Sequence, residues 1–396
     1  MSNVKCQMSN VKLLSIGYLT TVIFLFLYSF TQVDLGLTLT KWSIWQVAQK
    51  FFQSIGYFNR PFSAFLYILI ISLLFIFYLS FLFLANKNRI GKRQVWIMIL
   101  FTGVLLAFSY NAFSYDLFNY IFDAKIVTHY HQNPYLQKAL DYPGDPMLSF
   151  MHWTHRLYPY GPVWLFLTVP LSFLGFQFFL PTFFLFKILM SASFVGSVFY
   201  IGKIVRKISP ENEVFSLIFF GLNPLVIIES LVSAHNDIVM SSLLLMSIYL
   251  LINNKYIRSI FILILSIGIK YATIILIPFY LVSIFFSKKK KIEWQVFILL
   301  LIFPMILSIA LASLRTNFQP WYLLYVLPLA ALISKKFYIF VPAVVISFFS
   351  LLQYAPFLYL GNWDKPVPSI LFWMTVIPII LSLIFIIVWP LKKVIK

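Results

Sequence analysis

Cysteine and charge are both scarce in this chain of 396 residues. The single cysteine, Cys6, excludes an internal disulfide framework and a metal cluster held by cysteines. Charged residues make up only 10% of the chain and hydrophobic residues 61%, whereas a soluble globular domain is roughly half apolar. The composition therefore excludes a large soluble domain and indicates an integral membrane protein.

Nucleotide-binding motifs are also missing from the sequence. We find no G-x-G-x-x-G, no Walker loop and no H-E-x-x-H. A transferase that acts outside the cytoplasm, where nucleotide sugars are unavailable, would need an activated donor carried by the membrane. We expect no resident cofactor.

Long apolar runs recur from one end of the chain to the other. Each is long enough to cross a hydrocarbon core of about 30 Å, and their spread favours helices over the alternating pattern of a barrel. We predict an all-α, polytopic transmembrane helical bundle with about 10–13 membrane helices, about ten of them full crossings. The whole chain, 1–396, would form a single integral membrane domain.

The net charge of +19 is a topology signal rather than a sign of nucleic-acid binding. Placing the basic clusters in the cytoplasm satisfies the positive-inside rule and leaves anionic lipid, not nucleic acid, as their partner. The clusters are Lys87 to Arg93, Lys203 to Lys207, Lys255 with Arg258, Lys288 to Lys291, Lys335 with Lys336, and Lys392 to Lys396.

This topology places 113–161 outside, as an exofacial catalytic loop after spans at about 61–85 and 94–112. The segment 42–58 reads as a helix lying in the outer interface. Between 161 and 203 we expect one full span and one short helix broken near Gly175. The basic residues at both ends of 258–288 favour two shorter helices that meet near Lys270.

Acids and histidines are few and gather in two places. The chain has 11 acidic residues and five histidines, and four of each lie within 113–161. The fifth histidine lies in SAHND, 233–237, which the topology brings to the same side. Ionisable groups near a membrane are unfavourable unless they are paired or line a watery cavity, so this clustering is a functional-site hypothesis.

A helix over 114–128 would place Asp116, Tyr120 and Asp123 on one face. Asp116 suits a general base, or simply a charge that the helix dipole favours in the first turn. We expect Asp123 to pair with Lys125 and order the loop.

The other polar candidates each have two interpretations. Lys270 stands alone among apolar residues and needs an anion, either a phosphate or a carboxylate such as Glu229 or Asp237. Arg156 and Arg315 suit phosphate binding or snorkelling at the interface. His152 and His155, at i and i+3, are a weak pattern for a divalent metal site, to which His129 and His131 could add.

Five stretches together resemble the membrane glycosyltransferases of the C superfamily, nearest to the polyprenol-phosphate-mannose-dependent mannosyltransferases of the bacterial alpha-1,6 type. In order, over about residues 100–335, they are YDLFNYIFDAKI…HQNPY, YPYGPVW, NPLVIIESLVSAHND, IKYATIILIP and QPWYLLYVLPL. The resemblance implies a helical bundle with an outer-face cavity and inverting sugar transfer from a polyprenyl phosphate carrier.

The resemblance also implies roles for individual residues. Asp116 matches the family's loop aspartate and would be the catalytic base; because it follows the third span here and not the first, Asp123 stays the alternative. Lys270, Arg156 and His155 would bind the donor phosphate. The sugar or acceptor pocket would be lined by Asp123, Tyr120, Tyr160, His235, Asn236, Asp237, Gln319, Trp321 and Tyr322.

These expectations combine into one function: transfer of a sugar, mannose by resemblance, from a polyprenyl-phosphate donor to a cell-envelope glycan or glycolipid. The protein would be a multi-pass protein of the cell membrane with its active site on the extracytoplasmic side. The alternatives are a lipid-carrier flippase or envelope polysaccharide transporter, for which the internal repeat typical of transporters is not visible, and a non-catalytic assembly subunit.

Overall fold

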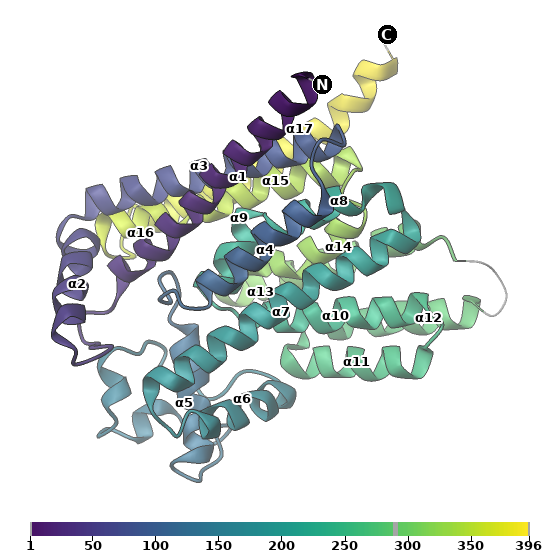
Figure 1. Ribbon diagram of the computed structural model, residues 1–396. Coiled ribbons are helices and arrows are strands. Elements are labelled where there is room, and N and C mark those ends of the chain that lie inside the picture. Colours follow the sequence, from purple (N-terminus) through teal and green to yellow (C-terminus); the bar gives the residue numbers. More distant parts are fainter. Residues whose placement is uncertain (1, 288–291, 395–396) are drawn as a thin grey trace.

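The computed structural model describes residues 2–287 and 292–394, and every regular element within them is a helix. Six helices are long and apolar enough to cross a membrane, or seven if one bent pair is counted as a span. They lie in α1 (Ser2–Ser29), α3 (Arg60–Asn86), α7 (Phe179–Ile208), α13 (Trp294–Thr316), α15 with α16 (Phe337–Leu352, Tyr354–Leu360) and α17 (Val367–Val394). The predicted all-α, multi-pass architecture is confirmed (Figure 1).

The number of long helices is lower than the ten or so full crossings expected. Among the described residues, four further apolar helices have only 10–17 residues, because polar residues, glycine or tight turns interrupt the apolar runs. They comprise α6 (Pro162–Leu174), α10 (Asp237–Ile252), α11 (Tyr256–Ile269) and the segment Tyr271–Phe285, which includes most of α12 (Ile277–Ser287). The interruptions supply the irregular backbone on which the polar residues stand.

The bent pair breaks at Asn223-Pro224, between α8 (Glu213–Gly221) and α9 (Pro224–Ile227). The helix axis bends by 53° at this break. The Asn223 side chain accepts a hydrogen bond from the amide of Leu225 at 2.9 Å, and Pro224 occupies the first helical position, where it has no amide proton to leave unpaired. A π-helical turn, Ile228–Val232, follows and leads to SAHND.

The predicted meeting of two shorter helices near Lys270 is confirmed. α11 ends at Ile269, and Lys270 is extended before the chain turns into the 3-10 segment Tyr271–Leu276. Gly161 donates to the carbonyl of Ile269 at 3.2 Å, and a Cβ on Gly161 would lie only 2.2 Å from the Gly268 carbonyl oxygen. The YPYGPVW turn therefore packs directly on the end of α11.

The predicted interfacial helix is α2 (Ser43–Gln53). Gln49 and Gln53 face inward and donate to the carbonyls of Leu37 and Val33 at 2.7 and 3.1 Å. The apolar side chains of Val47 and Phe51 are exposed. This inverted amphipathic arrangement suits a helix whose outer face contacts lipid.

The basic turns and the loop 113–161 lie at different ends of the bundle. Glu213 joins two basic turns, since Lys92 Nζ and Arg206 Nη2 each lie 2.7 Å from its Oε1. α5 (Asp116–Thr128) and α6 lie at the end away from both chain termini (Figure 1). The cluster Lys288 to Lys291 and Lys396 fall outside the described residues.

Candidate active site

Asp116 begins α5, at the end of the bundle far from the termini (Figure 1). Its amide donates to Ser114 Oγ at 3.2 Å, and its carboxylate stands in the first helical turn, where the helix dipole favours negative charge. The side chain keeps 21% of its surface exposed, whereas the next residues, Leu117 and Phe118, are fully buried. Asp116 is thus held by the helix start and stays accessible from outside the protein.

His235 lies in the turn between the π-helical segment and α10. The preceding residue, Ala234, has a φ of 55°, a left-handed conformation that costs a non-glycine residue about 1–2 kcal/mol. The turn is closed by the His235 amide, which donates to the Glu229 carbonyl at 3.0 Å. This strained turn folds the imidazole back toward the Glu229 side chain, and both side chains are fully buried.

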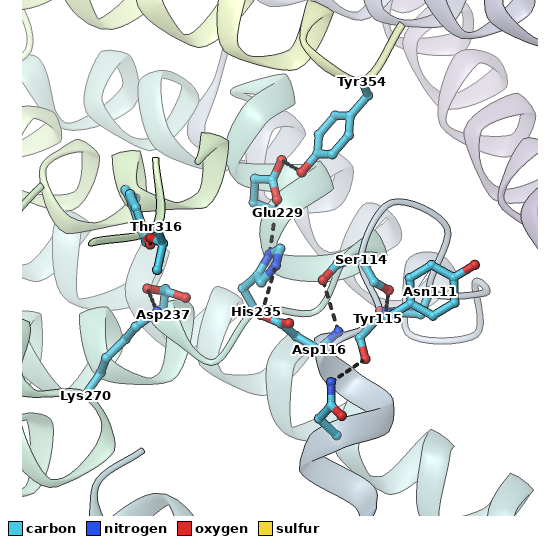
Figure 2. Close-up of polar contacts among 12 residues, drawn as sticks. Asn111, Ser114, Tyr115, Asp116, Glu229, His235, Asp237, Lys270, Thr316 and Tyr354 are labelled. Carbon is cyan, nitrogen blue, oxygen red and sulfur yellow. Dashed lines mark hydrogen bonds and ion pairs between the residues drawn. The ribbon is translucent and has the colours of Figure 1, made fainter. Parts of the chain in front are cut away.

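Asp116, His235, Glu229 and Tyr354 form a continuous line of close contacts, which we call the carboxylate–histidine chain. Asp116 Oδ2 lies 3.8 Å from His235 Nε2, and His235 Nδ1 lies 3.1 Å from Glu229 Oε2. The Tyr354 hydroxyl donates to Glu229 Oε1 at 2.9 Å. Figure 2 shows the side chains in this order. The two contacts of His235 are ion-pair distances, since neither ring nitrogen has a hydrogen bond of good geometry.

Lys270 pairs with Asp237 at the start of α10, with 2.8 Å between Nζ and Oδ1 (Figure 2). Of the two anions that the sequence left open, the structure therefore supplies a carboxylate. The lysine side chain is still 22% exposed, and its ammonium lies 5.8 and 5.6 Å from the ring centroids of Tyr322 and Tyr325. Asn236, next to Asp237, is buried, and its amide atoms have no hydrogen-bond partner among the described residues.

The segment RTNFQPWY, 315–322, which we call the rim segment, contains the expected pocket residues Gln319, Trp321 and Tyr322 and packs on this cluster. Trp321 stacks on His235 with 4.1 Å between ring centroids. The Tyr322 hydroxyl hydrogen-bonds with Thr316 Oγ1, and Gln319 Nε2 donates to the Thr316 carbonyl at 3.3 Å. Trp321 and Tyr322 thus lie at the cluster, with Gln319 in the same turn.

Tyr120 and Tyr160 lie edge to face, with 5.1 Å between ring centroids. Burial raises the pKa of both phenols well above the usual range, and the nearby charge of Asp116 adds to the effect. Both hydroxyls are therefore protonated and can act as donors beside Asp116. The structure brings together these two tyrosines, Asp116, His235, Asp237 and Lys270, as the sequence analysis expected.

His155 and Arg156 are not brought to this cluster. Both side chains are exposed, and the Arg156 guanidinium lies 4.3 Å from the ring centroid of Trp153. Within the described chain, neither side chain hydrogen-bonds or pairs with Asp116 or Lys270. Their expected phosphate-binding roles stay predictions.

The expected ion pair between Asp123 and Lys125 is wrong. Lys125 pairs instead with Asp145, which also accepts hydrogen bonds from the Tyr130 hydroxyl at 2.7 Å and the Met147 amide at 2.9 Å. Asp123 is half-buried; burial raises the pKa of its carboxyl, and the charge of Asp116 raises it further. The loop is therefore ordered through Asp145.

The loop histidines do not share one site. His152 stacks on Tyr115 with 3.8 Å between ring centroids, and His129 Nδ1 lies 2.9 Å from Gln177 Oε1. Over residues 2–287 and 292–394, no group of three or more His, Cys, Asp or Glu side chains is placed to hold a metal ion.

Sequence reasoning missed three residues around the cluster. Glu229 was considered only as a partner of Lys270, and nothing marked Tyr354. Lys187 is a fully buried lysine in α7 that donates to Ser109 Oγ at 3.0 Å, to the Val232 carbonyl at 3.2 Å and to the Leu231 carbonyl. Its isolation in an apolar run is the same signal that singled out Lys270.

A comparison with protein families now adds to this geometry. Residues 24–285 match the family model described as alpha-(1->6)-mannopyranosyltransferase, N-terminal domain, which covers more than half of the chain. The chain belongs to this family. No curated protein and no solved structure matches it.

Family membership supports mannosyl transfer as the reaction, and hence a sugar donor and an acceptor as substrates. It favours an enzyme over the flippase or transporter alternative. The matched range contains Asp116, Glu229, His235 and Lys270, whereas Trp321 and Tyr354 lie beyond it.

Proposed function

We propose that the chain transfers a mannosyl group, with inversion, from a polyprenyl-phosphate donor to a hydroxyl of a cell-envelope glycan or glycolipid at the outer face of the cell membrane. The observation that carries the proposal is Asp116, a partly exposed carboxylate at a helix start beside a buried polar cluster in a membrane protein of the mannosyltransferase family. Buried polar groups at membrane depth are rare unless they serve a function.

In the proposed reaction, Asp116 takes the proton of the acceptor hydroxyl while that oxygen bonds to the anomeric carbon. The bond from this carbon to the donor phosphate oxygen breaks, and its electron pair leaves with the polyprenyl phosphate. Attack and departure on opposite sides of the carbon invert its configuration. No step needs a nucleotide or a redox partner.

Lys270 is the proposed contact for the leaving phosphate. Its ammonium pairs with Asp237, and its side chain is partly exposed. Both residues belong to the same cluster as Asp116. A fixed positive charge at the point where negative charge develops lowers the barrier to departure. His155 and Arg156, on the exposed loop that follows α5, are further proposed phosphate contacts, which they could make only when the donor is bound.

The proposed outer-face location follows from the arrangement of charge. The basic turns joined by Glu213 are typical of the cytoplasmic side, and α5 lies toward the other end of the bundle (Figure 1). An active site on the outer side requires a donor that the membrane itself delivers, which favours a polyprenyl phosphate over a nucleotide sugar.

The test uses purified protein in lipid bilayers with radiolabelled polyprenyl-phosphate mannose and candidate glycan acceptors. We expect transfer by the wild type and a loss of about 10²- to 10⁴-fold in Asp116→Asn, since this is what a general base contributes. Asp123→Asn is the matched control on the same helix. Transfer by Asp116→Asn with loss in Asp123→Asn would move the base to Asp123, and transfer from a nucleotide sugar alone would refute the lipid donor.

A further inference from the structure

Glu229 and His235 have no part in the transfer step described above, although they lie directly behind Asp116. Both side chains are fully buried, and no lysine or arginine pairs with Glu229 among the described residues. Burying two titratable groups side by side costs free energy that hydrophobic residues at the same positions would not cost. Their placement therefore calls for an explanation other than stability.

We propose that Glu229 and His235 are positioning residues that take up, through Asp116, the proton removed from the acceptor hydroxyl. This inference rests on the proposed function, with Asp116 as the base. It assigns to His235 a part different from the pocket-lining role that the sequence suggested. It also gives a role to Glu229 and, through it, to Tyr354.

The order of the contacts sets the direction of proton movement. Glu229 Oε2 lies 3.1 Å from His235 Nδ1 and Asp116 Oδ2 lies 3.8 Å from Nε2, so a proton on Nδ1 would face Glu229 and leave the Nε2 lone pair facing Asp116. The hydroxyl of Tyr354 holds the other oxygen of Glu229 at 2.9 Å and so fixes the carboxylate behind the ring. Trp321 stacks on the imidazole and limits its rotation. In the proposed arrangement, Nδ1 carries the proton of the neutral ring and Nε2 is the atom that accepts a proton from Asp116.

The acceptor proton passes first to Asp116 as the new C–O bond forms, and the phosphate leaves with the electrons of the old one. Asp116 then gives the proton to His235 Nε2 and becomes a carboxylate again. The resulting imidazolium lies between the carboxylates of Asp116 and Glu229, which stabilise it. The proton later returns through Asp116 to the departed phosphate or to water.

The distance of 3.8 Å from Asp116 to His235 is longer than a hydrogen bond. Asp116 can approach, because its carboxylate is partly exposed and makes no hydrogen bond to any described residue. Such contacts are often long in a free enzyme and tighten once substrate is bound.

Other ionisable groups surround Asp116, Glu229 and His235, and these groups stay unchanged in all the variants that are compared for pH dependence. Asp123, Tyr120 and Tyr160 lie near Asp116, and Tyr67 lies near Glu229. The neighbouring polar groups of α10, α11 and the rim segment are the pair Asp237 and Lys270 with Tyr322 and Tyr325. None of these groups lies between Glu229 and His235, so a change at Glu229 acts first on the His235 imidazole.

The experiment measures kcat/KM for mannosyl transfer from pH 5 to 9 in lipid bilayers, for the wild type, Glu229→Gln, Glu229→Asp and His235→Gln. Glu229→Gln removes the charge that stabilises the imidazolium, so we expect the acid limb of its profile to move about 1 to 3 pH units lower, with a rate loss of about tenfold or more. Glu229→Asp keeps the charge and should hold the limb near its wild-type position. In His235→Gln the rate should fall by about tenfold or more at every pH tested, because the acceptor of the second proton transfer is gone.

Glu213→Gln is the matched control, because Glu213 is an ion-paired glutamate at the basic turns. Thermal stability of each purified variant shows whether it is folded, and Tyr354→Phe supplies a milder change at Glu229 if Glu229→Gln is not stable. An acid limb that stays in place in every folded Glu229 and Tyr354 variant overturns the inference. The proposed function fails separately, if the wild type does not use the lipid donor or Asp116→Asn keeps full activity.

Discussion

Lys270 Nζ and Asp237 Oδ1 lie 2.8 Å apart, although 33 positions separate the two residues in the sequence. The Asp237 side chain is almost fully buried, and the lysine reaches it from the end of α11, where the backbone is extended. This ion pair connects α10 with the break at Lys270 and so holds two of the short helices together beside Asp116.

Lys270→Met should destabilise the protein by about 3–5 kcal/mol, because it leaves a buried carboxylate without a partner. The double variant Lys270→Met with Asp237→Asn removes both charges and should recover most of that loss. Thermal unfolding in lipid or detergent measures the difference. If Lys270 also binds the donor phosphate, the double variant will remain poor in donor KM even though its stability is restored. Equal stability of Lys270→Met and the wild type would contradict the pairing.

Gly161→Ala should destabilise the site by about 1–3 kcal/mol, the range found for overpacked positions. Its new Cβ would lie 2.2 Å from the carbonyl oxygen of Gly268 and would push the end of α11 away from the YPYGPVW turn. Gly144→Ala is the control, because a Cβ there meets nothing within 4 Å. Melting temperatures of the two variants provide the check; a Gly161→Ala protein as stable as Gly144→Ala would show that the approach is easily relieved.

The loop 113–161 should lose stability in acid through Asp145. Burial opposes ionisation of Asp145, but hydrogen bonds from Lys125, Tyr130 and the Met147 amide outweigh it and lower its pKa. A lowered pKa in the folded state means that the stabilisation is present above the ordinary aspartate range and disappears as the pH falls through the lowered value. Limited proteolysis of the loop at pH 7 and at pH 3 should show this loss. Asp145→Asn should already be susceptible at pH 7, whereas the exposed Asp364→Asn should behave as the wild type does.

Asp123 should have the opposite effect on stability. Its raised pKa means that the folded protein holds a proton which the unfolded chain has already released, so this contribution is complete below the ordinary aspartate range and is lost as the pH rises. Asp123→Asn cannot release a proton and should flatten this part of the stability profile. Melting temperatures of both proteins between pH 4 and pH 8 measure it; parallel profiles would show that Asp123 is ionised in the folded state.

Much of the architecture follows from local sequence patterns. Apolar runs predict the helices, and basic residues at both ends of one run predict the pair of helices around Lys270; the structure confirms both. The convergence of Asp116 with His235 and Lys270 was also expected, since all three were placed on one side of the membrane. These are properties of segments, and hydrophobic burial acts on segments as wholes.

The partners of the polar side chains could not be read from the sequence. Lys125 was assigned to Asp123, two positions away, whereas it pairs with Asp145 across a folded loop. Glu229 and Tyr354 meet although 125 residues separate them. The sequence also did not show which of the apolar helices are short, because a polar break shortens a helix without changing the hydropathy around it.

The sequence by itself determined that this is a helical membrane protein, that its helices break near Gly175 and Lys270, and which few ionisable groups gather at one side. Only the tertiary structure decided which carboxylate neutralises Lys270, that Glu229 stands behind His235, and that His235 faces Asp116. The physical reason is the range of each interaction. Helix formation and membrane insertion depend on neighbours along the chain, while an ion pair requires two atoms within about 4 Å, which is set by how distant helices pack.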